Sequence, residues 1–325
     1  MDYDVFNGDA DGICALHQLR LATPRKAKLI TGVKRDVGLL DRLGKVENAH
    51  ITVLDISLDR NRKSLQGLLL RNCSVHYIDH HYCGDLPVAE NLIAHIDPDP
   101  GICTAVIVDR LLEGRYRAWA VVAAFGDNLG ETAKKLAASL AIGSESLAQL
   151  RELGELMNYN GYGAALSDLH FNPVQLYEAV QPFEDPLTFF KQSKVMARLR
   201  VGFSADMAKA EAYKPEIRFN AGDIYRFPAE PWAKRVAGAF MNLRARENQN
   251  RAHALLVEND DNSFLVSVRA PLENRVGADV LCREFPTGGG RAAAAGINCL
   301  PETDLCVFSH SFKRVFGAPN ADANF

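Results

Sequence analysis

The chain has 325 residues, of which 47% are hydrophobic and 24% charged, and its formal net charge is −3. This length supports a large core and favours two domains, and no apolar run approaches the roughly 20 residues that a membrane span requires. The net charge is −4 over residues 1–175 and +1 over residues 176–325, so neither part has the basic excess of a protein that follows a long nucleic-acid backbone.

The first part of the chain alternates short apolar runs with amphipathic stretches. The runs predict strands at 3–6, 27–33, 50–57 and 74–79, and the stretches between them predict helices at 12–22, 36–44 and 60–71. This alternation predicts an α/β fold with a doubly wound parallel sheet. Apolar residues then recur at helical spacing between residues 102 and 157, which predicts helices that cover this sheet.

The second part begins after a helical connector at about 182–212. Beyond it, the pattern predicts strands at 216–219, 223–227, 253–258, 263–269 and 305–310, with helices at 231–246 and 276–284. These elements predict a smaller mixed α/β domain. The tail at 317–325 has few residues to bury, and we expect it to fray.

The seven cysteines and the N-terminus give no sign of secretion. The cysteines are odd in number and contain no CxxC pair, which favours buried thiols in a reducing compartment. The first residues lack the basic region and small-residue cleavage site of a signal peptide. We therefore expect a cytoplasmic protein, with no membrane association.

Acidic residues and histidines follow the predicted strands at the points where the strands end. They are Asp9 and Asp11 in the segment Asn7-Gly8-Asp9-Ala10-Asp11-Gly12, Asp55, and the triplet Asp79-His80-His81. Because ligands bind at the carboxyl edge of an open α/β sheet, this recurrence indicates a metal centre. With two adjacent histidines, one imidazole can ligate metal while the other meets the substrate.

Each of these acids also has a purely structural interpretation. Asp11 could cap the helix that begins at Gly12 or Ile13, while Asp9 solvates a turn, and Asp55 could form an N-cap or an Asx-turn. Asp127, after the helix predicted at 118–125, could be a solvated helix end or a further oxygen ligand. The recurrence at several strand ends favours the metal site.

The donor set indicates the kind of metal and the chemistry. Carboxylates with few imidazoles and no thiolate suit Mn²⁺ or Mg²⁺ better than structural zinc. Two such ions, about 3.5 to 4 Å apart, can activate water and clamp the oxygens of a phosphoryl group. Phosphoester hydrolysis is the chemistry that this set favours.

Taken in order and spacing, these motifs resemble the four motifs of the DHH phosphoesterase superfamily. The segment Thr287-Gly288-Gly289-Gly290-Arg291-Ala292-Ala293-Ala294-Ala295-Gly296 resembles the DHHA1 signature of the same superfamily. The resemblance covers nearly the whole chain. It implies a DHH metal-binding catalytic domain at 1–180, a helical linker at 181–214 and a DHHA1-like substrate-binding domain at 215–325.

The resemblance also implies roles for individual residues. It assigns Asp9 and Asp55 to one Mn²⁺, and assigns Asp55 together with Asp11, His80 and Asp127 to the other. It implies that His81 hydrogen-bonds a nonbridging phosphate oxygen and that Asp79 orients His80. The first motif reads closest to RecJ-type single-strand exonucleases, although the chain is too short for their additional nucleic-acid-binding domains.

In the second domain, we expect backbone N–H groups of Gly288, Gly289 and Gly290 to form an anion-binding concavity, and Arg269 to reach a distal phosphate. A flexible turn before a helix at 291–295 is the alternative for the glycines, and a surface charge is the alternative for Arg269.

Two residues depart from the superfamily pattern. Asn7 stands near the place of a metal-binding His or Asp, and its uncharged amide predicts weaker binding of the first ion or a different ligand count. Arg291 stands where the usual motif has His, and it replaces a titratable donor with a permanent charge suited to phosphate.

The expected function is a Mn²⁺-dependent phosphodiesterase for short oligonucleotides or linear dinucleotides, as in oligoribonucleases, with Mg²⁺ as the alternative metal. Cyclic dinucleotides, 3'-phosphoadenosine 5'-phosphate, pyrophosphate or polyphosphate and single strands are alternative substrates. A catalytically weak nucleotide-binding regulator and a partner-binding scaffold are alternatives of other classes. Long duplex nucleic acid is not expected as a partner, and a homodimer is compatible with the sequence.

Overall fold

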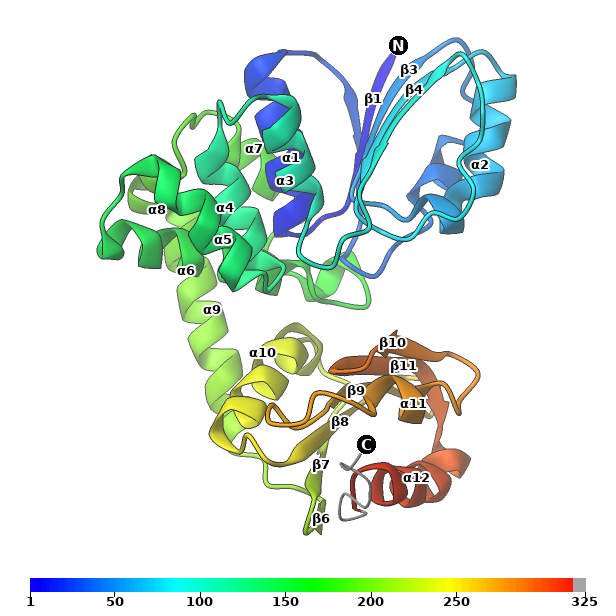
Figure 1. Cartoon of the computed structure of the whole chain (residues 1–325), viewed down its shortest axis with the longest axis vertical. Helices are drawn as coiled ribbons and strands as arrows, with labels where there is room; N and C mark the ends of the chain where they lie inside the picture. The colour runs from blue at the N-terminus through cyan, green and yellow to red at the C-terminus, as the bar shows by residue number, and fades with distance from the viewer. Residues whose placement is uncertain (318–325) are drawn as a thin grey trace, which may run out of the picture. The chain divides into compact units, whose positions relative to one another are not determined.

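The computed structural model describes residues 1–317, which divide into two compact units (Figure 1). The first unit is Met1–Gly202, and the second begins at Phe203. The division falls inside helix α9 (Lys194–Glu211). The tail beyond Gly317, which the sequence predicted to fray, lies outside the described residues.

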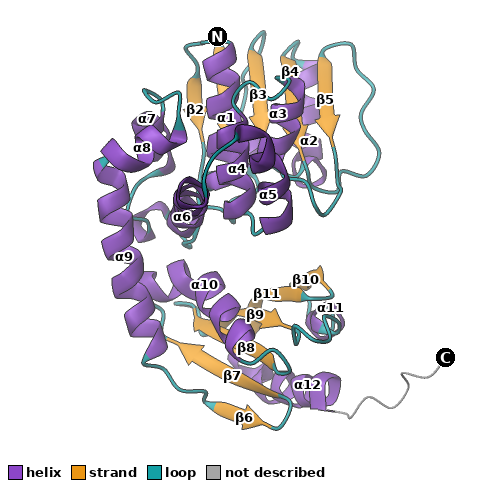
Figure 2. Cartoon of the chain, turned by 60° about the vertical axis from the view of Figure 1, so that its left-hand side comes forward, coloured by secondary structure: helices purple, strands orange, loops and turns teal. Residues whose placement is uncertain are grey.

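The first unit is built on a five-stranded parallel sheet, and the predicted fold class is confirmed. The strand order is β2-β1-β3-β4-β5 (Figure 2). Val5 and Val53, in the middle of two inner strands, are fully buried, as in parallel sheets covered on both faces. The strands are β1 (Asp2–Phe6), β2 (Lys28–Ile30), β3 (His50–Leu54), β4 (Ser74–Asp79) and β5 (Leu92–Ile96).

Helices cover both faces of this sheet. In Figure 1, α2 lies on one face and α1, α3 and α4 lie on the other. Leu65 and Leu68 of α2, together with Leu40, are buried in the core between this helix and the sheet. The helical elements are α1 (Ala10–Ala22), η1 (Leu39–Leu43), α2 (Leu58–Leu70), α3 (Thr104–Leu111), α4 (Arg117–Gly126), α5 (Gly130–Ala137), η2 (Ala138–Leu140), α6 (Ser144–Gly161), η3 (Leu166–Asp168), α7 (Pro173–Val180) and α8 (Pro186–Gln192).

The second unit is a six-stranded mixed sheet of order β10-β11-β9-β8-β7-β6, in which β7 and β8 are the parallel pair. Alternate residues of β7 serve two cores: Tyr225 packs on Phe240 of α10, whereas Ile224 belongs to the core with Phe308 and Phe312 of α12. The elements are β6 (Ile217–Phe219), β7 (Gly222–Phe227), α10 (Pro231–Glu247), β8 (Ala252–Glu258), β9 (Ser263–Arg269), α11 (Ala278–Cys282), β10 (Gly288–Arg291), β11 (Ala294–Pro301), η4 (Glu302–Asp304) and α12 (Leu305–Gly317).

Two local predictions and one alternative interpretation differ from the structure. The strand predicted at 305–310 is the start of α12, because Phe308 and Phe312 repeat at helical spacing and share one buried face. The glycine run and the alanines after it form the hairpin of β10 and β11 instead of a turn before a helix. The helical connector predicted at about 182–212 is interrupted at Ser193, whose backbone is extended between α8 and α9.

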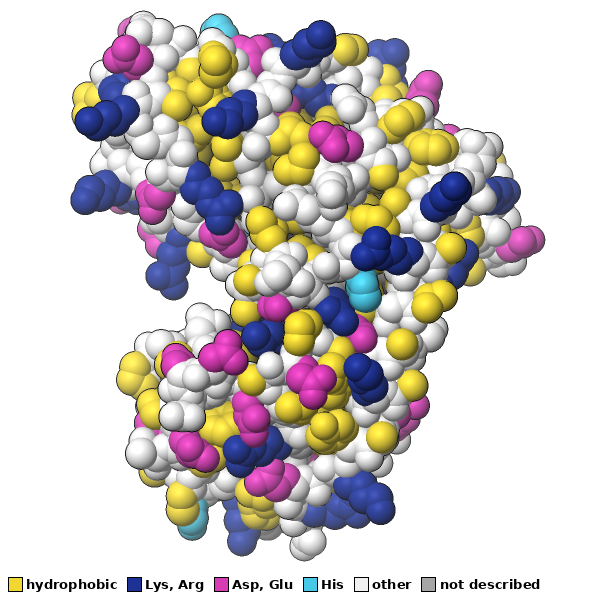
Figure 3. All heavy atoms as spheres, turned by 180° about the vertical axis from the view of Figure 1, so that it is seen from behind, with side chains coloured by type: hydrophobic (Ala, Val, Ile, Leu, Met, Phe, Trp, Pro, Cys, Tyr) yellow, Lys and Arg dark blue, Asp and Glu magenta, His cyan; other side chains and the backbone are white. Residues whose placement is uncertain are grey.

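No helix within residues 1–317 is both long and apolar enough to span a bilayer. On the face shown in Figure 3, basic and acidic side chains are interspersed over both units.

Candidate metal centre

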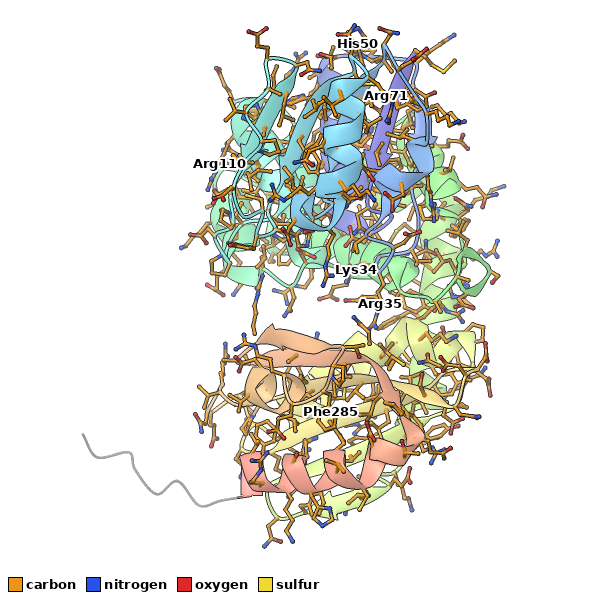
Figure 4. All side chains as sticks on the ribbon, turned by 90° about the vertical axis from the view of Figure 1, so that its right-hand side faces the viewer. Lys34, Arg35, His50, Arg71, Arg110 and Phe285 are labelled. Atoms are coloured by element: carbon orange, nitrogen blue, oxygen red, sulfur yellow. The ribbon has the colours of Figure 1, made fainter. Side chains whose placement is uncertain are left out.

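The acidic motifs of the first unit gather at the carboxyl edge of its sheet. Asp9 and Asp11 follow β1, Asp55 follows β3, and His80 and His81 follow β4. The parallel register places Leu54 beside both Phe6 and Ile78, so the three strands end together. In Figure 4, Lys34 lies at this edge, and His50 lies at the opposite end of the unit.

Two groups of side chains could hold a metal ion, and His80 belongs to both. Asp55, His80 and His81 form the first group, and Asp11, His80 and Asp127 form the second, with ligand atoms within 4.8 Å of one another in each. The Nε2 atom of His80 lies 3.5 Å from Asp55 Oδ1 and 3.7 Å from Asp127 Oδ2. His80 is therefore the centre of the donor set.

The carboxylates of this site are buried together at a considerable electrostatic cost. Burial, followed by repulsion from Asp11, Asp9, Asp127 and Asp79, raises the pKa of Asp55 well above its ordinary value. Asp55 also has a left-handed backbone with φ of 59°, which is uncommon for a residue other than glycine. A divalent cation would relieve the repulsion, and the carboxylate-rich set suits Mn²⁺ or Mg²⁺.

Asp9 and Asp11 both accept hydrogen bonds from the start of a helix, but the residue that caps α1 is Asp9 and not Asp11. Asp9 is the N-cap of α1, and its Oδ1 accepts hydrogen bonds from the N–H groups of Asp11 (3.0 Å) and Gly12 (3.1 Å). The carboxylate of Asp11 instead accepts from Thr104 and Ala105, at 2.7 Å each, where α3 begins. A carboxylate has about four lone-pair sites, so these backbone bonds by themselves leave lone pairs on Asp9 and Asp11 for a cation or for another donor.

The two histidines have different surroundings. The side chain of His80 is 10% exposed, whereas that of His81 is 43% exposed. The buried carboxylate of Asp79 contacts Nδ1 of His81 at 2.7 Å, so Asp79 holds His81, although the resemblance had implied that it orients His80. Burial works to lower the pKa of His81, but the hydrogen bond and charge of Asp79 raise it overall.

Lys34 and Asn158 belong to the site, and sequence reasoning missed them. The Nζ of Lys34 donates to Asp9 Oδ2, to Asp127 Oδ1 at 3.1 Å and to Asn158 Oδ1 at 2.9 Å. Burial works to lower the pKa of Lys34, but Asp9 and Asp127 raise it well above its ordinary value. Lys34 follows the strand predicted at 27–33, so its place at the carboxyl edge was a usable signal.

Asn7 contacts the segment that carries Lys34. Its Nδ2 donates to the backbone oxygen of Lys34 at 3.2 Å, and the N–H of Lys34 donates to Gly161 at 2.9 Å. The Oδ1 of Asn7 is buried and has no hydrogen-bond partner in the described structure. The Asn7 amide therefore helps to fix the backbone of Lys34.

In the second unit, the predicted substrate residues lie on neighbouring strands. Ala294 of β11 pairs with Arg269 of β9 on one side and with Arg291 of β10 on the other, so the two arginines occupy one row of the sheet. Arg269 donates to Asn242 Oδ1 at 3.0 Å, and Arg291 is exposed.

The glycines lie in edge strand β10, which pairs with β11. A Cβ on Gly288 would lie 1.7 Å from the Cys282 oxygen, and one on Gly290 would lie 2.5 Å from the Ala295 Cα. Packing thus requires glycine at these two positions. Gly289 has open space around it, so a role in binding phosphate stays a prediction for this strand.

Comparison with known proteins extends this description. No family model and no curated protein sequence matches the chain. Among solved structures, a DHH-domain protein from a family of ribosomal proteins matches with a TM-score of 0.68 and 13% identity, over 96% of this chain and 85% of that one. The chain has the DHH-domain fold.

Two further structures with this fold match over nearly the same range. The exonuclease RecJ bound to manganese has a TM-score of 0.61 at 16% identity, over 98% of this chain and 91% of that one. A pGpG-specific phosphodiesterase, PggH from Vibrio cholerae, has a TM-score of 0.52 at 14% identity, over 98% of this chain and all of that one. The DHH fold thus comes with a candidate Asp/His cluster at the carboxyl edge of the parallel sheet.

Proposed function

We propose that this chain is a Mn²⁺-dependent phosphodiesterase that hydrolyses short oligonucleotides or linear dinucleotides. The observation that carries the proposal is the convergence of Asp11, Asp55 and Asp127 on His80 in a DHH fold. Two structures that share this fold are an exonuclease bound to manganese and a pGpG-specific phosphodiesterase. Mg²⁺ is the alternative metal.

In the first unit, the proposed roles follow from burial and contacts. His80 and the carboxylates around it would hold the divalent metal, which supplies activation of water and polarisation of the phosphoryl oxygens. Asp79 fixes the ring of His81 through Nδ1, which leaves Nε2 to hydrogen-bond a nonbridging phosphate oxygen. The greater exposure of His81 supports a role toward substrate, and the burial of His80 supports a role toward metal.

In the second unit, Arg269 and Arg291 would bind a phosphate of the substrate. They lie in one row of the sheet, and guanidinium groups recognise phosphate in a bidentate way. The balanced charge of the chain, −4 over residues 1–175 and +1 over residues 176–325, favours a small phosphorylated substrate over a polymer. A cytoplasmic location and a homodimer stay predictions.

Product analysis with Mn²⁺ tests the proposal. Purified protein is incubated with a 5'-phosphorylated dinucleotide, a cyclic dinucleotide, 3'-phosphoadenosine 5'-phosphate, pyrophosphate and a long single strand, and the products are separated. The His80→Ala variant removes the shared ligand. His50→Ala removes an exposed histidine at the opposite end of the unit and serves as the matched control.

Each outcome has a defined meaning. Rapid release of mononucleotides from the dinucleotide, lost in His80→Ala and kept in His50→Ala, supports the proposal. Preference for another substrate of the panel keeps the metal-dependent hydrolysis and changes the substrate. Nucleotide binding without any turnover, in protein shown to contain metal, contradicts the proposal and favours a nucleotide-binding regulator.

A further inference from the structure

The ammonium group of Lys34 is fully used within the candidate metal centre. A lysine ammonium has three donors, and Lys34 directs them to three oxygens, on Asp9, Asp127 and Asn158. Its side chain is only 21% exposed, and its backbone is held by Asn7 on one side and Gly161 on the other. Lys34 is therefore a fixed positive charge among the carboxylates.

Lys34 also separates Asp9 from the other donors. Its ammonium contacts Oδ2 of Asp9, while Oδ1 of the same carboxylate caps α1, so both oxygens of Asp9 are engaged. Among the described residues, Asp9 belongs to neither group that could hold a metal ion. The donors that remain converge on a single imidazole nitrogen, Nε2 of His80.

The two candidate groups share His80, and one nitrogen atom binds one ion, so the two groups mark one metal position. The charges agree with this arrangement. Apart from Asp79, which contacts His81, the carboxylates around the site are those of Asp9, Asp11, Asp55 and Asp127, and Lys34 offsets one of these charges permanently. A single divalent cation would offset two more.

We propose that Lys34 takes the place of the first of the two ions implied by the resemblance, so that each chain binds one divalent ion, at His80. Asn7 supports this role of Lys34, because its amide positions the backbone of Lys34 and carries no charge for a metal ion. This inference rests on the proposed function for the identity of the site. It concerns the number of ions and the role of Lys34.

Metal stoichiometry provides the test, and Mn²⁺ alone is the probe. Protein freed of metal with a chelator is dialysed against Mn²⁺, and bound manganese per chain is measured by mass spectrometry and by calorimetric titration. Electron paramagnetic resonance then separates an isolated ion from a pair, because two ions about 3.5 to 4 Å apart are magnetically coupled. The proteins are the wild type, Lys34→Met, and Arg35→Gln as the control for loss of a neighbouring exposed cation (Figure 4).

We expect one uncoupled Mn²⁺ per chain in the wild type and in Arg35→Gln. In Lys34→Met, the freed carboxylates of Asp9 and Asp127 should raise the stoichiometry twofold and give a coupled spectrum. A wild-type chain that binds a coupled pair overturns the inference, even if Lys34→Met does not fold.

The outcomes also distinguish this inference from the proposed function. One bound ion without hydrolysis of any substrate contradicts the function and leaves the role of Lys34 intact. Two bound ions with hydrolysis contradict the role of Lys34 and leave the function intact. A chain that binds no Mn²⁺ contradicts both.

Discussion

The buried histidine of α1, His17, should make the first unit lose stability as the pH falls from neutral. Its Nε2 lies 2.7 Å from the backbone oxygen of Phe183, and its ring packs edge-on against Trp119 with centroids 4.7 Å apart. Burial lowers the pKa of His17 from 6.5 to about 4, and the bond to Phe183 works in the opposite direction. The folded unit therefore holds His17 neutral at a pH where an unfolded chain would protonate it.

The sign and size of the effect follow from linkage. Below pH 6.5 the unfolded chain takes up a proton that the folded chain refuses until the pH approaches about 4, so the free energy of unfolding falls within this window. The difference between these pKa values corresponds to about 3 kcal/mol, since one pKa unit is worth about 1.4 kcal/mol. The stabilisation is fully present above pH 6.5 and lost as the pH falls through the folded pKa.

Urea unfolding at a series of pH values measures this loss. The chain has two tryptophans, so a Trp232→Phe background leaves Trp119, which contacts His17, as the fluorescent reporter of the first unit. Against this background, His17→Gln should flatten the pH dependence by about 2 to 3 kcal/mol between pH values of about 7 and 4.5. His50→Gln, at an exposed position of the same unit, should follow the parent. Parallel curves for His17→Gln and its parent would refute the reasoning.

Three further predictions concern packing, the site and the thiols. Gly154→Ala should destabilise the first unit by about 1 to 3 kcal/mol, although alanine has the better helix propensity, because the added Cβ would lie 2.1 Å from a carbonyl oxygen of α4. Gly143 has open space around it, so the control Gly143→Ala should unfold at nearly the wild-type urea concentration. Asp79→Asn should reduce hydrolysis by about 10- to 100-fold by loosening His81, while calorimetry shows unchanged Mn²⁺ binding; equal loss of metal would contradict this role. A thiol reagent should rapidly label only the exposed cysteines of the native protein, and slow labelling of these thiols would contradict their exposure. The exposed cysteines are Cys299 and Cys306.

The sequence by itself determined the parallel sheet and the location of the site. Short apolar runs separated by helix-length amphipathic stretches allow little other than parallel strands with crossover helices. The acids at the ends of the strands predicted at 3–6, 50–57 and 74–79 must then meet at one edge of the sheet. This result needs no knowledge of side-chain contacts, because topology alone brings the strand ends together. The second domain was likewise predicted in outline as mixed α/β, from the pattern of its strands and helices.

Only the tertiary structure decided which side chains at that edge contact one another. Whether Asp79 orients His80 or His81 depends on rotamers two residues from a strand end, and the sequence pattern is the same in both cases. The contact of Lys34 with Asp9, Asp127 and Asn158 joins four segments that are distant in the chain. The hairpin of β10 and β11 likewise depends on packing against β9 and α11. Local pattern fixes the element and the edge, whereas partner choice depends on long-range packing that no local window of sequence contains.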